Sequence, residues 1–339
     1  MNLKFKKPSK ETQLAMSRVA VGEDSRDYHS LSEEKLVNAT NHDNAKLVSS
    51  GSAAIMAVMN SIDGSIIVPN QGAWNGFKQI ANFLNKDLII VNTNQGLLTT
   101  NHLKETLTEL SQKTETDSED NNSKSALFLT SFAGYTAEQN IKEISDFAHK
   151  NNILLVEDAS GGICDSKERL ANGKYSDIII GSTGSPKIIN VEDGGFITSN
   201  DKGIFDKSKL LLKTSKASNI TACGIFNEID FAGDNLDKTI DACSYLKEKI
   251  ENETYFDVVH SKKRGINIII KSGNPKALSY KLRYEFRLDS HGMITKCPNY
   301  NRLKEKAVAI EIKNLDIDCL NHTNLDKMVD ILKNHEDLA

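Results

Sequence analysis

Two ionisable side chains in the middle of the chain each follow an apolar strand pattern. Asp158 closes the run at 153–158 (ILLVED), and Lys187 follows the next run, 177–181 (DIIIG), after the short segment Ser182–Pro186. Ligands of open α/β sheets bind outside the carboxyl ends of the strands, so both side chains could face one ligand. A lysine that is partly desolvated at such an edge favours its neutral amine, a nucleophile toward aldehydes. In isolation, Asp158 could equally cap a helix and Lys187 could be an exposed loop residue.

Two further features could hold other parts of the same ligand. Ser50-Gly51-Ser52 precedes a helical pattern, where small residues let backbone N–H groups approach a phosphate and the Ser52 hydroxyl adds a donor. Trp74 follows the strand pattern that ends at Pro69, and its ring could stack on an aromatic cofactor or simply pack in the core. The order along the chain is phosphate-type helix start, aromatic, acid and then lysine. This order makes the combination more informative than any single member.

Alternating strand and helix patterns predict the elements that would position these residues. The candidate strands are near-continuously apolar, as in strands covered on both faces: 65–69, 88–91, 126–130, 153–158, 177–181 and 195–199. The candidate helices between them are 53–60, 76–84, 103–110 and 141–151. This alternation predicts an α/β fold with a mostly parallel central sheet and helices on both faces.

The pattern changes after residue 235, and we expect a large α/β domain over 1–235 and a small C-terminal α+β domain over 236–339. The small domain should contain a helix at 236–250, strands at 266–271, 282–286 and 307–312, and a last helix at 325–332. Residues 111–125 (SQKTETDSEDNNSKS) include no apolar residue and are rich in Ser, Asp, Glu and Asn. This composition predicts an exposed loop, in preference to a disordered regulatory segment.

The composition excludes several classes of protein. The net charge is −4 with acids and bases mixed, which argues against nucleic-acid binding. No apolar run is long enough to cross a membrane, and the lysine-rich N-terminus does not resemble a secretory signal. The five cysteines lack CxxC spacing, so we expect reduced thiols in a cytoplasmic protein and no metal site.

Several short segments resemble the DegT/DnrJ/EryC1/StrS aminotransferases, a branch of the fold-type I enzymes that use pyridoxal 5'-phosphate (PLP). The resemblance is clear over about residues 45–200. Residues 50–54 (SGSAA) resemble the family's phosphate-binding helix start, and 156–159 (VEDA) resemble its acidic motif. Pro69 and Trp74 resemble its proline–aromatic segment, with one extra residue between them, and Ser182, Lys187 and 192–195 (EDGG) resemble its lysine block.

The resemblance implies a role for each residue. Lys187 would carry PLP as a Schiff base and later act as the base at the substrate carbon, and Asp158 would pair with the pyridinium nitrogen. Gly51, Ser52 and Ser182 would hold the phosphate, and Trp74 would stack on the ring. A homodimer is also implied, because fold-type I sites lie at a subunit boundary.

Some positions depart from the family pattern. Gly161 and Gly162 occupy the stretch where Gln and His are usual, and Thr183 stands where Phe is usual. The family's Asn-Tyr-Arg segment is not intact, and either Asn219 or Asn227 could supply its Asn. These departures affect the substrate side more than the cofactor side.

The favoured function is therefore a PLP-dependent aminotransferase that moves an amino group from a donor such as glutamate to a keto substrate, with a nucleotide-linked keto-sugar as one candidate. Two alternatives remain open. A PLP-dependent lyase or desulfurase would need an active-site cysteine, for which Cys164 and Cys223 are the nearest candidates. A non-catalytic PLP-binding regulator would fit the altered second half. Lys187 argues against the family's sugar dehydrases, which have histidine at this position.

Overall fold

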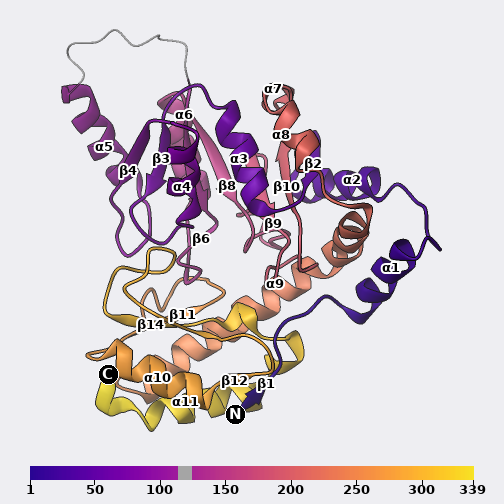
Figure 1. Cartoon of the computed structure of the whole chain (residues 1–339). Helices are drawn as coiled ribbons and strands as arrows, with labels where there is room; N and C mark the ends of the chain where they lie inside the picture. The colour runs from indigo at the N-terminus through magenta and orange to yellow at the C-terminus, as the bar shows by residue number, and fades with distance from the viewer. Residues whose placement is uncertain (114–123) are drawn as a thin grey trace.

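The computed structural model describes residues 1–113 and 124–339 and shows a central seven-stranded sheet above a smaller domain (Figure 1). In sheet order the strands are β2 (Asn44–Val48), β10 (Gly195–Ser199), β9 (Ile178–Ser182), β8 (Ile153–Asp158), β5 (Ser125–Thr130), β3 (Ile66–Pro69) and β4 (Leu88–Val91). β10 is antiparallel to both of its neighbours, and the remaining pairs are parallel. The prediction of a mostly parallel α/β sheet is confirmed.

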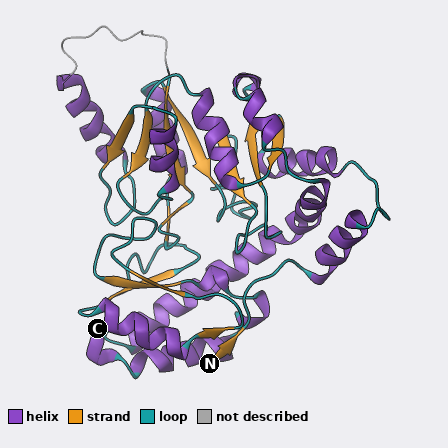
Figure 2. Ribbon diagram, viewed as in Figure 1, coloured by secondary structure: helices purple, strands orange, loops and turns teal. Residues whose placement is uncertain are grey.

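Helices cover both faces of this sheet (Figure 2). One apolar core joins the sheet to α2 (Tyr28–Thr40), α5 (Thr100–Lys113), α6 (Ile141–Lys150) and the first half of α9 (Asn219–Glu253). The opposite core joins it to α3 (Gly51–Ser61), α4 (Gly76–Phe83), α7 (Lys202–Lys207) and α8 (Lys209–Thr214). Successive strand residues alternate between the two cores: Leu155 lies in the first and Val156 in the second. Burial on both faces explains why these strands are almost uniformly apolar.

The six strands expected in the large domain are all present, but several other elements were not predicted, among them α7 and α8. β2, whose residues are NAKLV, is interrupted by Asn44 and Lys46, so its apolar pattern is weak. Helices α1 (Lys10–Ala20) and α2 were also not predicted from the sequence, because both contain many polar residues. The expected loop at 111–125 lies mainly outside the described residues, while 111–113 belong to α5 and Ser125 begins β5.

The small domain is built on a second sheet of order β11 (Ile268–Lys271), β14 (Ala307–Ile310) and β13 (Ile294–Lys296), covered by α10 (Pro275–Glu285) and α11 (His322–Lys333). The predicted strand at 282–286 is wrong, because most of it is the end of α10. Asn274 caps this helix and Pro275 occupies its first turn. Leu278 and Leu282, four residues apart, bury the same helical face.

Several smaller elements complete the fold. Residues Asn2–Leu3 (β1) pair with Arg287–Leu288 (β12), and the hairpin strands β6 (Phe132–Ala133) and β7 (Ala137–Glu138) follow β5. Three 3-10 helices lie near the C-terminus at Ile312–Asn314, Ile317–Cys319 and Glu336–Leu338. Both chain ends lie in the small-domain half of the molecule (Figure 1).

Helix α9 connects the two halves without a break. Its residues up to Ile240 belong to the core of the large sheet, and its residues from Ala242 belong to the core of the small sheet. The boundary at 235/236 stays a proposal, and it falls inside this continuous helix. None of the helices in the described parts of the chain is both long and apolar enough to cross a membrane.

Candidate active site

The carboxyl ends of β8 and β9 and the start of α3 surround a cavity of about 210 Å³. All six residues selected from the sequence line it: Gly51, Ser52, Trp74, Asp158, Ser182 and Lys187. They come from four separate segments of the chain. The arrangement follows the rule that open α/β sheets bind ligands beyond the carboxyl ends of their strands.

The start of α3 lies directly against the end of β9. Ser50 caps the helix, its hydroxyl accepting a hydrogen bond from Ala53 N at 3.1 Å. A Cβ atom at position 51 would lie 2.6 Å from Ser182 Cβ, so only glycine allows this approach. The positive end of the α3 dipole therefore opens on the cavity beside the Ser52 and Ser182 hydroxyl groups.

Asp158 is held at the end of β8 by Ser160. The Ser160 backbone N–H and hydroxyl both donate to Asp158 Oδ1, at 3.0 and 2.5 Å. The same hydroxyl accepts a hydrogen bond from Ser182 N at 2.8 Å. Ser160 thus connects the ends of β8 and β9 and fixes the carboxylate, which is only 8% exposed, at the wall of the cavity.

Lys187 points into the site, and Tyr135 meets its amine. Lys187 Nζ donates a hydrogen bond to Tyr135 Oη at 3.0 Å and lies 5.3 Å from the centre of the tyrosine ring. Burial lowers the pKa of the Lys187 amine, but Tyr135 and Asp158 outweigh it, and the net pKa lies above the ordinary value. The expectation that desolvation favours the neutral amine is therefore wrong for the site without cofactor, because two polar partners stabilise the ammonium form.

Trp74 lines the same cavity from the segment between β3 and α4. Its indole packs across Gly76, where any Cβ would collide with ring carbons, and contacts Phe77 edge-on at 6.1 Å between ring centres. The side chain is half-buried, so part of it remains available to a ligand.

A second, adjoining cavity of about 140 Å³ shares Trp74, Tyr135 and Lys187 with the first. Arg302 and Lys313 of the small domain also line it, and their cationic groups lie 4.8 and 5.2 Å from the Tyr135 ring centre. Tyr135, Arg302 and Lys313 were not predicted as site residues from the sequence. Tyr135 lies in a Gly-containing turn directly after a predicted strand, which is a usable signal, whereas Arg302 and Lys313 join the site only through docking of the small domain.

Glu311 anchors the two small-domain cations. Its carboxylate accepts from Arg302 Nε at 2.8 Å and Arg302 Nη2 at 3.0 Å, and lies 3.5 Å from Lys313 Nζ. Burial alone would raise the pKa of Glu311, but the two cations lower it to about 2. Burial lowers the pKa of Lys313 to about 7, although Glu311 opposes this change. Arg302 therefore places a buried positive charge beside the cavity that contains the Lys187 amine, and Lys313 gains or loses its charge near neutral pH.

The two glycines that depart from the family pattern lie in closely packed surroundings. A Cβ at Gly161 would lie 2.8 Å from Ile266 Cδ1 and 3.2 Å from the Tyr135 ring, and one at Gly162 would lie 2.6 Å from Ser131 Oγ. Tyr135 and Ile266 therefore fill space beside Gly161 that a larger residue there would need. Thr183 is buried and donates its hydroxyl to the backbone oxygen of Asp193 at 2.6 Å.

Neither candidate asparagine lines the cavity of its own chain. Asn219 binds the backbone at the start of α2, accepting from Tyr28 N at 3.1 Å and donating to Arg26 O at 3.0 Å. Asn227 donates to Cys223 O, one turn earlier in α9, at 2.7 Å. Both amides thus have partners within the subunit.

The residues of the larger cavity fit PLP in kind and in placement. A helix start with hydroxyl groups suits its phosphate, a buried carboxylate suits its ring nitrogen, and the lysine amine suits its aldehyde. The glycine at position 51 lets the start of α3 lie directly against Ser182, which brings the helix start and the Ser182 hydroxyl to the same wall of the cavity.

Comparison with known proteins agrees with this geometry. The model of the DegT/DnrJ/EryC1/StrS aminotransferase family matches residues 14–225, and the chain belongs to this family. Residues 233–333 match the C-terminal domain of the MJ1341 family.

A relative from Campylobacter jejuni, UDP-4-amino-4,6-dideoxy-N-acetyl-beta-L-altrosamine transaminase, is 27% identical over 155 residues. The matched stretch covers 40% of this chain and 41% of the relative, so the chain spans less than half of that protein's length in the match.

The fold is similar to solved structures over nearly its whole length. Helicobacter pylori PseC, an aminotransferase involved in the biosynthesis of pseudoaminic acid, has a TM-score of 0.76 at 12% identity, and the match covers 99% of this chain and 100% of PseC. Sphingomonas wittichii serine palmitoyltransferase has a TM-score of 0.73 at 12% identity, with 98% and 86% covered. The molecule therefore has the fold-type I architecture of PLP-dependent enzymes.

Proposed function

We propose that this protein is a PLP-dependent aminotransferase that moves an amino group from an amino-acid donor to a keto substrate. Family membership supports the reaction class, and the name of the Campylobacter relative supports a nucleotide-linked keto-sugar as the acceptor. The single observation that carries the proposal is the convergence of Lys187, Asp158 and the α3 start on one cavity.

Each residue of that cavity would have a defined task. Bound PLP supplies an electron-accepting ring for the charge that develops when the substrate carbon loses its proton. Asp158 would keep the ring nitrogen protonated, and Ser160 would hold Asp158 in place. Lys187, freed by the incoming amine, would move the proton at the substrate carbon, with the Tyr135 hydroxyl orienting its Nζ.

The adjoining cavity would hold the carboxylate of the amino donor. Arg302 provides a buried positive charge there, and Lys313 adds a second one when it is protonated. Glu311 fixes the Arg302 guanidinium by a two-point contact. A carboxylate bound at this place would lie beside Tyr135 and Lys187, which line both cavities.

The positions of the two candidate cysteines argue against the lyase or desulfurase function. Neither Cys164 nor Cys223 lines the cavity, and burial raises the pKa of both thiols, that of Cys164 to about 12. A thiol with a raised pKa is a poor nucleophile. The regulator alternative remains a question for experiment.

The experiment that separates these functions is a half-reaction followed by the visible absorption of bound cofactor. Purified protein loaded with PLP is mixed with glutamate and other amino acids. Conversion of the cofactor to its amino form supports transamination, and release of sulfide or pyruvate supports a lyase. An absorption spectrum that no amino acid changes supports a regulator and contradicts the proposal.

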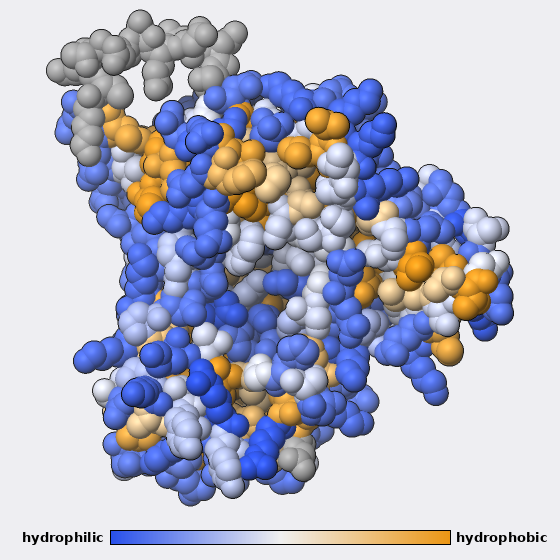
Figure 3. Space-filling view, viewed as in Figure 1, coloured by the Kyte–Doolittle hydropathy of each residue, from blue (hydrophilic) through white to orange (hydrophobic). Residues whose placement is uncertain are grey.

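We also propose that the protein is a cytoplasmic homodimer. The five free cysteines are consistent with a reducing compartment. Helices α1 and α9 pack together, and apolar side chains on them and at the end of α1 are exposed, namely Leu14, Phe231 and Val21. Figure 3 shows apolar surface over this part of the molecule, as a subunit interface requires. Light scattering of the purified protein should give twice the mass of the chain, and a monomer mass would contradict the dimer.

A further inference from the structure

A large basic cavity lies outside the candidate active site. Its volume is about 600 Å³, within the usual range for small-molecule sites, and it shares no lining residue with the two cavities around Lys187. Six cationic side chains line it: Lys142, Lys167, Arg169, Lys262, Lys263 and Arg264. The whole chain has a net charge of −4, so this concentration of positive charge runs against its overall balance.

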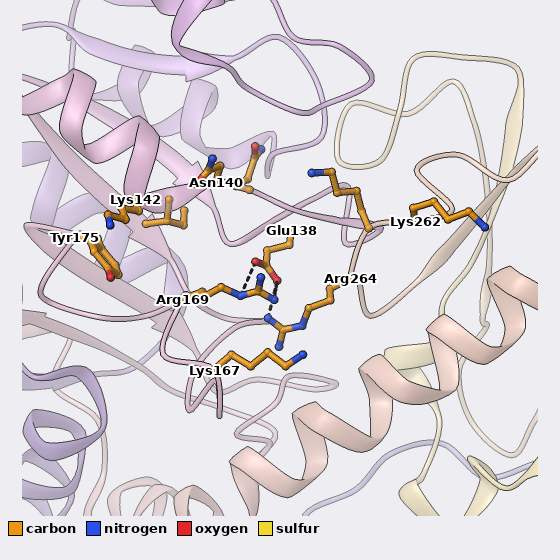
Figure 4. A pocket seen from close by; sticks show the side chains of 11 residues that line it. Glu138, Asn140, Lys142, Lys167, Arg169, Tyr175, Lys262 and Arg264 are labelled. Atoms are coloured by element: carbon orange, nitrogen blue, oxygen red, sulfur yellow. Dashed lines mark hydrogen bonds and ion pairs between the residues drawn. The ribbon is translucent and has the colours of Figure 1, made fainter.

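The cations come from three segments that converge on Glu138 (Figure 4). Lys142 lies in the first turn of α6, Lys167 and Arg169 lie in the loop after β8, and residues 262–264 belong to the small-domain side. In Figure 4, Arg169 and Arg264 meet Glu138 at the centre, with Lys142 and Tyr175 to one side.

These segments are held by buried contacts. Lys247, 1% exposed, donates from Nζ to the backbone oxygens of Thr136, His260 and Lys263 at 2.6, 3.2 and 2.9 Å. The Asp165 carboxylate accepts from the backbone N–H of Arg169 at 3.0 Å, which fixes the loop after β8. The positive groups therefore stand on a rigid frame, so a ligand would pay little for ordering the backbone.

Part of this charge has no counter-ion. Arg264 pairs with Glu138 and Asp165 at 2.6 and 2.5 Å, and Arg169 pairs with Glu138 at 3.2 Å. Lys262 is paired with Glu251 and points away from the centre. Within residues 1–113 and 124–339, no ion pair is formed by Lys142, Lys167 or Lys263.

Two further features favour an anion at this place. The start of the ten-residue helix α6 opens on the cavity through Asn140, Ile141 and Lys142, which adds the positive end of a helix dipole. Glu143 in the same turn does not line the cavity, and its carboxylate accepts hydrogen bonds from Asn140 Nδ2 at 2.7 Å and Thr100 Oγ1 at 3.1 Å. The Nε of Arg264 is buried and has no hydrogen-bond partner in the described structure.

We propose that this basic cavity binds a diphosphate-bearing small molecule. Three uncompensated ammonium groups and a helix start match the charge of a diphosphate better than that of a single carboxylate. Tyr175, at the Lys142 side of the cavity, offers a face on which a ring attached to the diphosphate could stack. The pyrophosphate binding tested below is independent of the aminotransferase activity proposed above, whereas the acceptor as a source of the diphosphate rests on that activity.

The test is calorimetric titration of the PLP-loaded protein with inorganic pyrophosphate, at about 0.05 M and about 0.2 M salt. We expect saturable binding that weakens at the higher salt. The double variant Lys142→Ala/Lys167→Ala should lose about tenfold or more in affinity. The matched control is Lys209→Ala/Lys213→Ala, two exposed lysines of α8, which should bind as the parent does.

Two results would overturn the proposal. One is the absence of saturable pyrophosphate binding to the parent protein, and the other is equal binding by the parent and the Lys142/Lys167 variant. Unchanged cofactor loading and thermal unfolding in the variant show that its loss is local.

The source of the diphosphate is decided by the complete reaction with a nucleotide-linked keto-sugar in the presence of pyrophosphate. Inhibition that is competitive with the keto-sugar and is lost in the Lys142/Lys167 variant assigns the site to the diphosphate of the acceptor. A changed rate of the donor half-reaction assigns it to a regulatory ligand, and binding without either effect assigns it to a ligand that takes no part in the reaction.

Discussion

At the scale of single residues, Tyr135 and Asp158 determine the protonation state of the Lys187 amine. Lys187 Nζ donates a hydrogen bond to the Tyr135 hydroxyl, and both Tyr135 and Asp158 raise the pKa of the amine, whereas burial lowers it. The protein without cofactor therefore holds a protonated lysine at neutral pH. Coupling to an aldehyde needs the neutral amine, so the Tyr135 hydroxyl should influence the pH at which cofactor is captured.

Tyr135→Phe should shift that pH dependence downward. The change removes a hydrogen-bond acceptor from the ammonium group, so the charged form loses a stabilising contact and the pKa of the Lys187 amine falls. The measurement is the rate of PLP uptake by cofactor-free protein across pH. Tyr175→Phe, outside this site, is the control, and an unshifted midpoint in Tyr135→Phe would contradict the assignment.

Lys313→Met tests the proposed carboxylate site. Loss of one charged contact should raise the KM for the amino donor by about 10-fold or more while cofactor loading is kept. Lys306→Met, an exposed lysine of the same domain that lines neither cavity, is the control. An unchanged donor KM would remove Lys313 from the substrate site.

At the scale of elements, the site depends on how closely the start of α3 meets the end of β9. The gap between them admits no Cβ at position 51, and Ser160 links the end of β9 to that of β8. Strand patterns in the sequence were sufficient to predict β8 and β9, because these strands are buried on both faces. The close approach itself had no signal beyond the SGS segment, because it depends on tertiary packing.

Gly51→Ala should therefore weaken cofactor binding more than a surface change does. The new methyl group would press on Ser182, and overpacking of this kind costs about 1–3 kcal/mol of unfolding free energy. Denaturant unfolding and PLP titration measure the two effects. Gly292→Ala, where a Cβ would meet nothing within 4 Å, is the matched control, and equal behaviour of the two variants would be evidence against the packing argument.

At the scale of the whole molecule, the small domain completes the site. Arg302 and Lys313 reach the Tyr135 ring, while Ile266 N and Asn267 N bond to the Tyr135 backbone oxygen at 2.8 and 2.9 Å. The sequence could indicate the cofactor-side residues, since they follow predicted strands. It could not indicate the small-domain cations, because their positions depend on domain docking, and the strand wrongly expected at 282–286 shows how weak the pattern is there.

Acid should weaken the fold through Glu311. The pKa of Glu311 is about 2 in the folded protein, below its ordinary value of 4.5. Between about pH 2 and pH 4.5 the folded state therefore binds fewer protons than the unfolded state. Its contribution, on the order of 3 kcal/mol, is present above about pH 4.5 and is lost as the pH falls toward 2. Unfolding free energies at several pH values should decline less steeply for Glu311→Gln than for the parent, each relative to its own neutral-pH value.

The exposed variant Glu34→Gln should keep the parental pH dependence and serves as the control. If Glu311→Gln and the parent lost stability in parallel over this range, the buried ion pair would not be the source of the acid sensitivity.

The central claim is that Lys187 is the residue that captures the cofactor. Reduction of the PLP-loaded protein with borohydride, followed by peptide mass spectrometry, tests it directly. We expect the reduced cofactor on the peptide that contains Lys187, and none on Lys187→Ala protein that keeps its fold by circular dichroism. Attachment to Lys313 or to another lysine in the parent protein would contradict the account.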